Sequence, residues 1–311
     1  MLHEVSFLSY NERDYVQGWI YVPATKIKGV IQLVHGYGEH SRRYFHMIVK
    51  FMEAGFVVAA DDHVGHGKTA MVNDTWGDWG TKGFETMMED EYTLKKLVQE
   101  KYPDVPYFMY GHSMGSLIAR EFSVKYGREL DGVIYCGTLG EKDFPCAEVI
   151  GPMQALVDEG KGSESEPSLI GKLFGGLFAR VDEEVKLGNE WICHDPYVQY
   201  DHANDPFDAF TKATNNWSAM FFTQMIMDVC NQEWAAKVPV ELPIYNVAGA
   251  EDPCGGFGEG VLEVSKWLED TGHNVKTKLY EGYRHEIHNY AAIKDEVEAG
   301  ILEFINGVLE K

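Results

Sequence analysis

From Tyr107 to Gly115 the chain reads YFMYGHSMG, and this stretch decides the fold. Its first four residues form an apolar run typical of a short buried strand, and a helix-length segment follows from Ser116 to Tyr126. Between the two, Ser113 stands at the centre of a Gly-x-Ser-x-Gly pattern. Such a sharp strand-to-helix turn needs small neighbours, and it points the hydroxyl toward the head of a helix, where backbone N–H groups favour a developing negative charge. The stretch therefore predicts that Ser113 is a nucleophile.

The sequence on either side of this stretch alternates between strand-like and helix-like segments. The predicted strands are Val30 to Val34, Phe56 to Ala60 and Val133 to Cys136, and the predicted helices between them are Tyr44 to Glu53 and Phe84 to Glu100. This order predicts an α/β fold, in which a mostly parallel sheet is flanked by helices on both faces. Ligands bind such sheets at the carboxyl ends of the strands, where Ser113 is expected to lie.

The alternation stops near Glu141 and resumes near Pro243. The later elements are two predicted strands, Ile244 to Ala248 and Val275 to Tyr280, and two predicted helices, Gly258 to Glu269 and Ala291 to Val308. The intervening segment has no clear strand pattern and contains a polar loop and two amphipathic stretches. We therefore predict a catalytic core formed by residues 1–140 and 237–311, with residues 141–236 inserted as a helical cap.

A serine hydroxyl needs a base, and the base needs an acid that orients it. In folds with this elbow the chain order is serine, acid, histidine. Asp252 follows the strand that ends at Ala248, and its neighbour Glu251 is the alternative acid. His285 lies in the loop directly after the last predicted strand, with His288 as the alternative base. The order and position favour Asp252 and His285.

Acyl transfer also requires hydrogen-bond donors for the oxyanion. One donor is expected to be the backbone N–H of Met114, directly after the nucleophile. The other is expected in the Gly-rich loop after Val34, where we assign the backbone N–H of Tyr37. A loop that merely reverses the chain would explain the glycines, but not their position beside the elbow.

Composition excludes several classes of protein. With 45% hydrophobic and 24% charged residues, the chain has an ordinary globular balance, and its net charge of -22 disfavours nucleic acid as a partner. No segment has the length of a membrane span or the pattern of a signal peptide. The five cysteines are odd in number and contain no Cys-x-x-Cys pair, which favours reduced thiols and a cytoplasmic location.

Two further motifs lack the context that their chemistry requires. His63 and His66 follow two aspartates, but no further cluster with the spacing of metal ligands completes a site. The Gly-rich stretch from Gly255 to Gly260 lacks the spacing of a dinucleotide loop. We therefore expect neither a metal nor a cofactor.

Four segments together resemble the monoacylglycerol lipase and lysophospholipase branch of the α/β-hydrolases, over nearly the whole chain. They are His35 to Tyr44, Asp62 to Gly67, Gly111 to Gly115, and Tyr280 to His285, with a weaker match at Asn204 to Pro206. The resemblance implies the α/β-hydrolase fold and a triad of Ser113, Asp252 and His285. It also implies oxyanion donors at Tyr37 and Met114.

The same resemblance implies that Glu39, Arg43 and His288 lie at the polar end of the pocket, where the family holds the glycerol hydroxyls. The chain departs from the family at two positions: Tyr37 stands where a small residue is usual, and Ser116 where glycine is frequent. The predicted cap is only loosely similar to the family's cap. An ester substrate is therefore better supported than monoacylglycerol itself.

The predicted cap has two apolar stretches that suit an acyl chain. Pro167 to Val181 carries an apolar stripe at helical spacing, and Trp217 to Val229 is rich in Met and Phe. Packing against the core accounts for most of these side chains, but such residues also adapt to flexible acyl chains. We expect Phe174 and Met225 to line an acyl site. The first stripe is a weak candidate for transient contact with membrane surfaces.

These features predict a serine carboxylic ester hydrolase that acts on a small acyl ester such as a monoacylglycerol or lysophospholipid. A serine peptidase of the same fold would need an acidic pocket for an amine, which the sequence does not clearly show. A thioesterase and a ligand-binding protein without turnover are further alternatives. The oligomeric state is not predicted.

Overall fold

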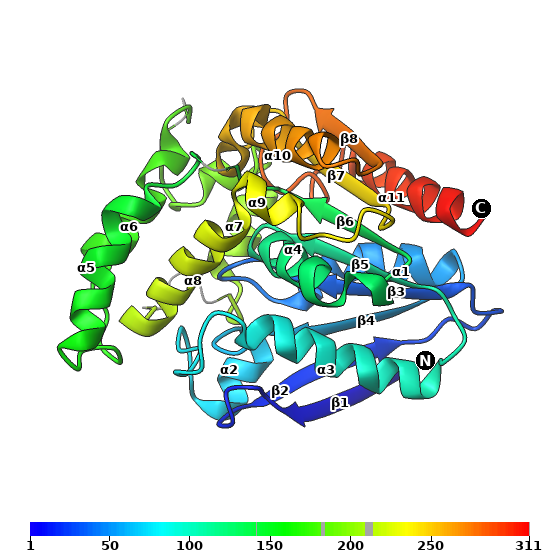
Figure 1. Ribbon diagram of the computed structural model, residues 1–311, viewed down its shortest axis with the longest axis horizontal. Coiled ribbons are helices and arrows are strands. Elements are labelled where there is room, and N and C mark those ends of the chain that lie inside the picture. Colours follow the sequence, from blue (N-terminus) through cyan, green and yellow to red (C-terminus); the bar gives the residue numbers. More distant parts are fainter. Residues whose placement is uncertain (141, 182–183, 209–213, 311) are drawn as a thin grey trace.

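The computed structural model describes residues 1–140, 142–181, 184–208 and 214–310, and its centre is an eight-stranded sheet (Figure 1). The order of the strands across the sheet is β1-β2-β4-β3-β5-β6-β7-β8. The strands are β1 (Leu2–Leu8), β2 (Tyr15–Tyr21), β3 (Gly29–Val34), β4 (Phe56–Asp62), β5 (Tyr107–His112), β6 (Gly132–Cys136), β7 (Ile244–Gly249) and β8 (Val275–Tyr280). From β4 to β8 all neighbours are parallel, which confirms the predicted mostly parallel sheet.

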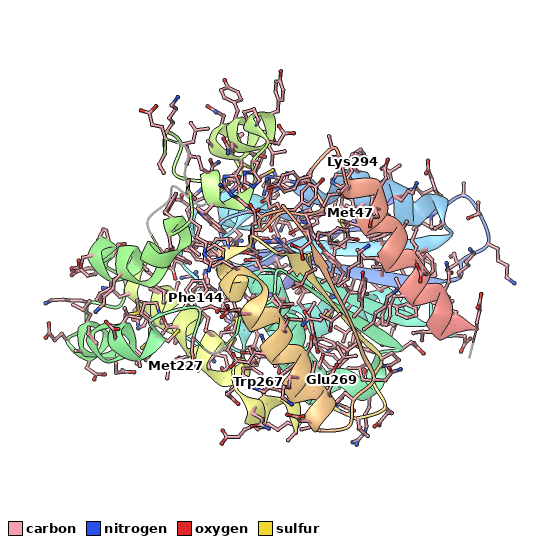
Figure 2. The ribbon with its side chains drawn as sticks, turned by 90° about the horizontal axis from the view of Figure 1, so that it is seen from above. Met47, Phe144, Met227, Trp267, Glu269 and Lys294 are labelled. Carbon is pink, nitrogen blue, oxygen red and sulfur yellow. The ribbon has the colours of Figure 1, made fainter. Side chains whose placement is uncertain are left out.

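The middle strands are buried because helices cover both faces of the sheet. Every residue of β3, β4, β5, β6 and β7 is buried, as expected for parallel strands with apolar sequences. One face is covered by α1 (Phe45–Glu53) and α11 (Lys294–Leu309), and the other by α3 (Thr86–Lys101), α4 (Met114–Tyr126) and α10 (Glu259–Asp270). In the view from above (Figure 2), Met47 of α1 lies near the start of α11.

The first two strands were not predicted. β1 and β2 form an antiparallel pair, and β2 is also antiparallel to β4. β1 is the edge strand, and only Phe7 of its seven residues is buried. Its sequence therefore lacks the continuous apolar run that marks the central strands.

The chain between β6 and β7 forms helices beyond one end of the sheet (Figure 1). They are α5 (Cys146–Asp158), α6 (Pro167–Phe174), α7 (Pro196–Asn204), α8 (Asn216–Val229) and α9 (Gln232–Ala235), with short 3-10 turns at Gly175–Phe178 and Glu190–Ile192. No strand occurs among the described residues of this segment. The division into a core and a cap, with the boundaries given above, stays a prediction.

The apolar stripe of residues 169–181 is not one α-helix. α6 ends at Phe174, and Gly175 and Gly176 begin a 3-10 turn, because paired glycines weaken a helix. Leu173 and Leu177 are buried, so this stripe faces the interior. Within the described ranges, no helix is both long enough and apolar enough to cross a membrane.

One shorter α-helix and three 3-10 turns complete the described elements outside the segment between β6 and β7. α2 (Gly67–Asn73) follows β4 and packs near β2, and a 3-10 turn at Ser41–Tyr44 precedes α1. Further 3-10 turns are Gly127–Glu129 after α4 and Pro253–Gly258 before α10. The loops after β3, β5, β7 and β8 open at the same end of the sheet, where the inserted helices lie.

Candidate active site

Ser113 occupies a strained turn between β5 and α4. Its backbone has φ 57° and ψ -121°, a conformation that is unfavourable for any residue with a side chain. Hydrogen bonds on both sides hold it: Ser113 N–H donates to the Cys136 carbonyl at 2.9 Å, and Ser116 N–H donates to the Ser113 carbonyl at 2.8 Å. The elbow is therefore fixed by β6 on one side and by the first turn of α4 on the other.

The two glycines of the elbow are needed because the backbone is packed so closely. A Cβ atom on Gly111 would lie 2.1 Å from the Gly115 carbonyl oxygen, and one on Gly115 would lie 2.1 Å from the carbonyl oxygen of Val34. Gly36, in the loop after β3, would place a Cβ 3.1 Å from the Cβ of Ser113. The glycine loop and the elbow are therefore in direct contact.

Asp252 and His285 form a buried pair. They follow β7 and β8 respectively, and His285 Nδ1 lies 2.8 Å from Asp252 Oδ2. The other carboxylate oxygen of Asp252 accepts a hydrogen bond from Cys254 N–H at 2.8 Å. Burial alone would lower the pKa of His285, but the Asp252 carboxylate outweighs it, and the pKa lies well above its ordinary value.

The alternative acid and base occupy different environments. Glu251 has a half-exposed side chain and pairs with His194 at 3.0 Å. His288 is fully buried, its ring stacks on Tyr44 with centroids 4.7 Å apart, and burial lowers its pKa well below the ordinary value. Of these candidates, the structure pairs only Asp252 with His285.

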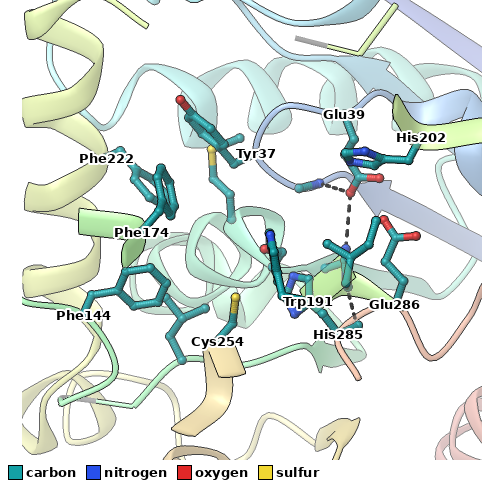
Figure 3. Close-up of a pocket in the computed structure, with 16 residues that line it drawn as sticks. Tyr37, Glu39, Phe144, Phe174, Trp191, His202, Phe222, Cys254, His285 and Glu286 are labelled. Atoms are coloured by element: carbon teal, nitrogen blue, oxygen red, sulfur yellow. Dashed lines mark hydrogen bonds and ion pairs between the residues drawn. The ribbon is translucent and has the colours of Figure 1, made fainter. Parts of the chain in front are cut away.

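One cavity brings Ser113 and His285 together (Figure 3). Its aromatic end is formed by Tyr37, Phe144, Phe174 and Phe222, and its polar end by Glu39, His202 and Glu286. Figure 3 shows Phe144, Phe174 and Phe222 on one side, opposite Glu39, His202 and Glu286. Met114 and Trp191 also line it.

Aromatic packing shapes one end of the cavity. The ring of Tyr37 stacks on Phe222, with centroids 5.2 Å apart, and contacts Phe174 at 5.3 Å. The Tyr37 hydroxyl hydrogen-bonds to the Thr214 hydroxyl. Met225 is fully buried on α8 and is not among the residues that line the cavity.

Charged groups hold the opposite end. Arg43 bonds to Glu286 with both terminal nitrogens, one of them at 2.8 Å, and to Glu39 Oε2 at 3.0 Å. Glu39 Oε1 accepts hydrogen bonds from Gly36 N–H and the Tyr44 hydroxyl, each at 2.6 Å. Glu39 lines the cavity, whereas Arg43 lies behind the two carboxylates.

Several residues of this site were not singled out in the sequence. Glu286 follows His285 directly, which was a usable signal, but its partner Arg43 is 243 residues away. His202 comes from α7, and the ring of Trp191 is tilted against that of His285, with centroids 5.2 Å apart. Cys254 also lines the cavity. No local sequence pattern pointed to His202, Trp191 or Cys254.

A second cluster differs from the sequence expectation. Glu91 of α3 completes a group with Asp61 and His63, and one ligand atom from each lies within 4.8 Å of the others. His63 Nδ1 is 3.4 Å from Asp61 and 3.5 Å from Glu91. Burial, followed by the charge of Asp61, raises the pKa of Glu91 well above its ordinary value.

Comparison with known proteins places the chain in a family. The sequence model of a protein family, described as "Hydrolase_4: Serine aminopeptidase, S33", matches residues 25–290. The chain belongs to this family. It is an α/β-hydrolase and a hydrolytic enzyme of the carboxylesterase and monoglyceride lipase type.

Individual relatives agree with this assignment. A carboxyl esterase from Bacillus coagulans, solved in complex with glycerol, is 56% identical, with 99% of each chain covered and a TM-score of 0.96. A lipase in an open form is 34% identical, with all of both chains covered and a TM-score of 0.91. The monoglyceride lipase of Rattus norvegicus is 27% identical over 91% of this chain and 83% of its own.

Proposed function

We propose that this protein is a serine carboxylic ester hydrolase that acts on monoacylglycerols, lysophospholipids or similar acyl esters. One observation carries the proposal: His285, whose Nδ1 lies 2.8 Å from the buried Asp252 carboxylate, lines the same cavity as Ser113 on its strained elbow. The bound glycerol in the Bacillus coagulans esterase supports a small ester substrate.

Each proposed catalytic residue has a defined role. Ser113 Oγ attacks the acyl carbonyl carbon, and His285 accepts the hydroxyl proton and returns it to the leaving alcohol. Asp252 holds the Nδ1–H tautomer of His285 and stabilises the imidazolium. Water, activated by His285, then releases the acid from the acyl-enzyme.

The oxyanion donors are assigned from the position of the backbone. Met114 begins α4, so its N–H lies at the positive end of the helix dipole. Tyr37 follows Gly36, which contacts the Ser113 Cβ position. We propose that these two N–H groups stabilise the tetrahedral oxyanion.

The two ends of the cavity suggest how the substrate lies. The aromatic end suits the acyl chain, with Phe174 as a wall, and the polar end suits the alcohol, with Glu39 in contact and Arg43 behind it. His288 and Met225 are buried and are not among the residues that line this cavity. We therefore propose that they support the walls from behind.

An aminopeptidase is the second candidate, because the family description names one and two carboxylates line the polar end. Both carboxylates are already bonded to Arg43, so neither is left for the direct ion pair that the terminal amine of a peptide would need. Thioester hydrolysis uses the same triad. Cytoplasmic residence and transient membrane contact through residues 169–181 are further proposals.

The test is hydrolysis of p-nitrophenyl esters of increasing chain length by the wild-type protein and by Ser113→Ala. We expect activity that disappears in Ser113→Ala and survives in Ser116→Ala, which removes a hydroxyl one turn away that bonds to the Ser113 carbonyl. A fluorophosphonate should label the wild-type protein but not Ser113→Ala. If no ester is hydrolysed but aminoacyl p-nitroanilides are, the aminopeptidase is correct.

A further inference from the structure

At the polar end of the cavity, buried carboxylates outnumber guanidinium groups. Two carboxylates, Glu39 and Glu286, share the single guanidinium of Arg43. The exposed fraction of each of the three side chains is 4% or less. Water therefore screens these charges weakly, and any excess charge acts strongly on a group bound nearby.

Both carboxylates are ionised. Burial alone would raise their pKa values, but hydrogen bonding from His112 and the charge of Arg43 hold the pKa of Glu39 well below its ordinary value. For Glu286, the charge of Arg43 outweighs burial and lowers the pKa to about 2. The pKa of Arg43 is raised well above its ordinary value, because these carboxylates outweigh its burial.

Three further titratable groups border this cluster: His202, Asp208 and His112, whose Nδ1 lies 3.2 Å from Glu39 Oε1. Burial, and then the charge of Arg43, lower the pKa of His202 to about 4, so this cavity residue is uncharged near pH 7. Burial raises the pKa of Asp208 to about 9, so it is also uncharged. The ion-pair cluster itself therefore holds two carboxylates against one guanidinium, an excess of one carboxylate.

This charge lies where the alcohol of the ester would leave. Glu286 is the residue after His285, and both line the cavity that contains Ser113. In Figure 3, Glu286 and Glu39 lie next to each other and opposite Phe174. The aromatic end provides no comparable charge and suits the acyl chain, so the charged end faces the leaving alcohol.

We propose that Glu286 is a specificity-determining residue that makes the alcohol site accept neutral or cationic alcohols and reject anionic ones. This inference rests on the proposed ester hydrolase. Arg43 would balance the charge of Glu39 alone. Glu286 adds a second carboxylate, which repels an anionic alcohol and so discriminates between similar substrates. Esters of polyols and of amino alcohols fit the site, whereas alcohols that carry a carboxylate or a phosphate monoester do not.

The test uses three butyrate esters that share one acyl group and differ in the charge of the alcohol: butyrylcholine, monobutyrin and the butyrate ester of glyceric acid. For the wild type, we expect kcat/KM for the choline and glycerol esters to exceed that for the glycerate ester by about tenfold or more. Glu286→Gln should reduce the choline-to-glycerate ratio by about tenfold.

Two control variants isolate the charge at this position. Glu286→Asp keeps the charge and should keep the wild-type ratio. Glu303→Gln makes the same change in net charge on an exposed side chain of α11, and should also leave the ratio unchanged. A change in the ratio that is confined to Glu286→Gln reports the local charge rather than the overall one.

The outcomes separate this inference from the function on which it rests. Equal kcat/KM values for the three esters in the wild type would overturn charge selection and leave the ester hydrolase intact, even if Glu286→Gln does not fold. A wild-type ratio that Glu286→Gln leaves unchanged would overturn the role of Glu286. Failure of the wild type to hydrolyse any of the esters would overturn the proposed function itself.

Discussion

The polar and aromatic ends of the cavity differ in what holds their side chains in place. At the polar end, Glu39 engages both carboxylate oxygens and Arg43 bonds to two carboxylates, so each group has a fixed direction. At the aromatic end, Phe174 and Phe222 are held by ring contacts, with centroids 5.8 Å apart. Ring contacts are non-directional compared with charged hydrogen bonds.

The two ends also come from different parts of the chain. Glu39 and Glu286 lie in loops that follow β3 and β8 of the sheet, whereas Phe174 and Phe222 lie on α6 and α8 of the inserted segment. A site whose groups are fixed by charged hydrogen bonds is expected to be selective, and one built from packed rings is expected to tolerate different shapes. We therefore expect narrow selection of the alcohol and broad selection of the acyl chain.

The largest expected effect is a loss of kcat when the buried Asp252–His285 pair is changed. Asp252→Asn keeps the shape of the side chain but no longer fixes the tautomer of His285, so kcat should fall by about three to four orders of magnitude. The control is Glu251→Gln, the neighbouring carboxylate that pairs with His194, for which we expect a change below about threefold. Equal losses in both variants would reject Asp252 as the acid.

The next largest effect is on the free energy of unfolding, and it tests whether Arg43 stabilises the two carboxylates of the polar end. Arg43→Met leaves Glu39 and Glu286 buried without their cation, and the free energy of unfolding should fall by about 3–5 kcal/mol. Arg42→Met is the matched control: Asp62 loses one partner but keeps hydrogen bonds from Ser41 and Lys68. Urea unfolding at pH 7 should therefore show a smaller loss for Arg42→Met.

The same charges predict how stability depends on pH. The pKa of Glu286 falls from an ordinary 4.5 to about 2, so its contribution to stability is present above pH 4.5 and is lost as the pH falls toward 2. Glu286→Gln should therefore be less stable than the wild type at pH 7, and this difference should shrink at pH 3. Urea unfolding at both values measures it, and a constant difference would contradict the assigned ionisation.

The elbow could be predicted from the sequence because its requirements are local. The strand, the glycines and Ser113 are adjacent, and each glycine is needed for a contact that any side chain would block. The edge strand β1 could not be predicted, because its largely exposed residues give no apolar run. Glu286 was missed for the opposite reason: its chemistry depends on Arg43, which no spacing rule connects to it.

Met225 shows a third limit of sequence reasoning. A stripe of Met and Phe residues indicates that one side of a helix is buried, but not what it is buried against. On α8, Phe222 lines the cavity, whereas Met225 is fully buried and is not among the lining residues. Two residues of the same stripe therefore have different surroundings.

The smallest expected effect on activity comes from Phe174→Ala, and its comparison with Met225→Ala tests whether the two residues have different roles. Phe174→Ala opens the aromatic end, so kcat/KM for the longest accepted acyl ester should change by about tenfold or less relative to a short ester. Met225→Ala should instead lower the free energy of unfolding by about 2–5 kcal/mol and leave the chain-length profile unchanged. Kinetics on a series of p-nitrophenyl esters, with urea unfolding of both variants, measures the two effects. If Met225→Ala shifts the chain-length profile as much as Phe174→Ala does, the acyl chain reaches past the aromatic rings to Met225. The acyl site then extends beyond the cavity that contains Ser113.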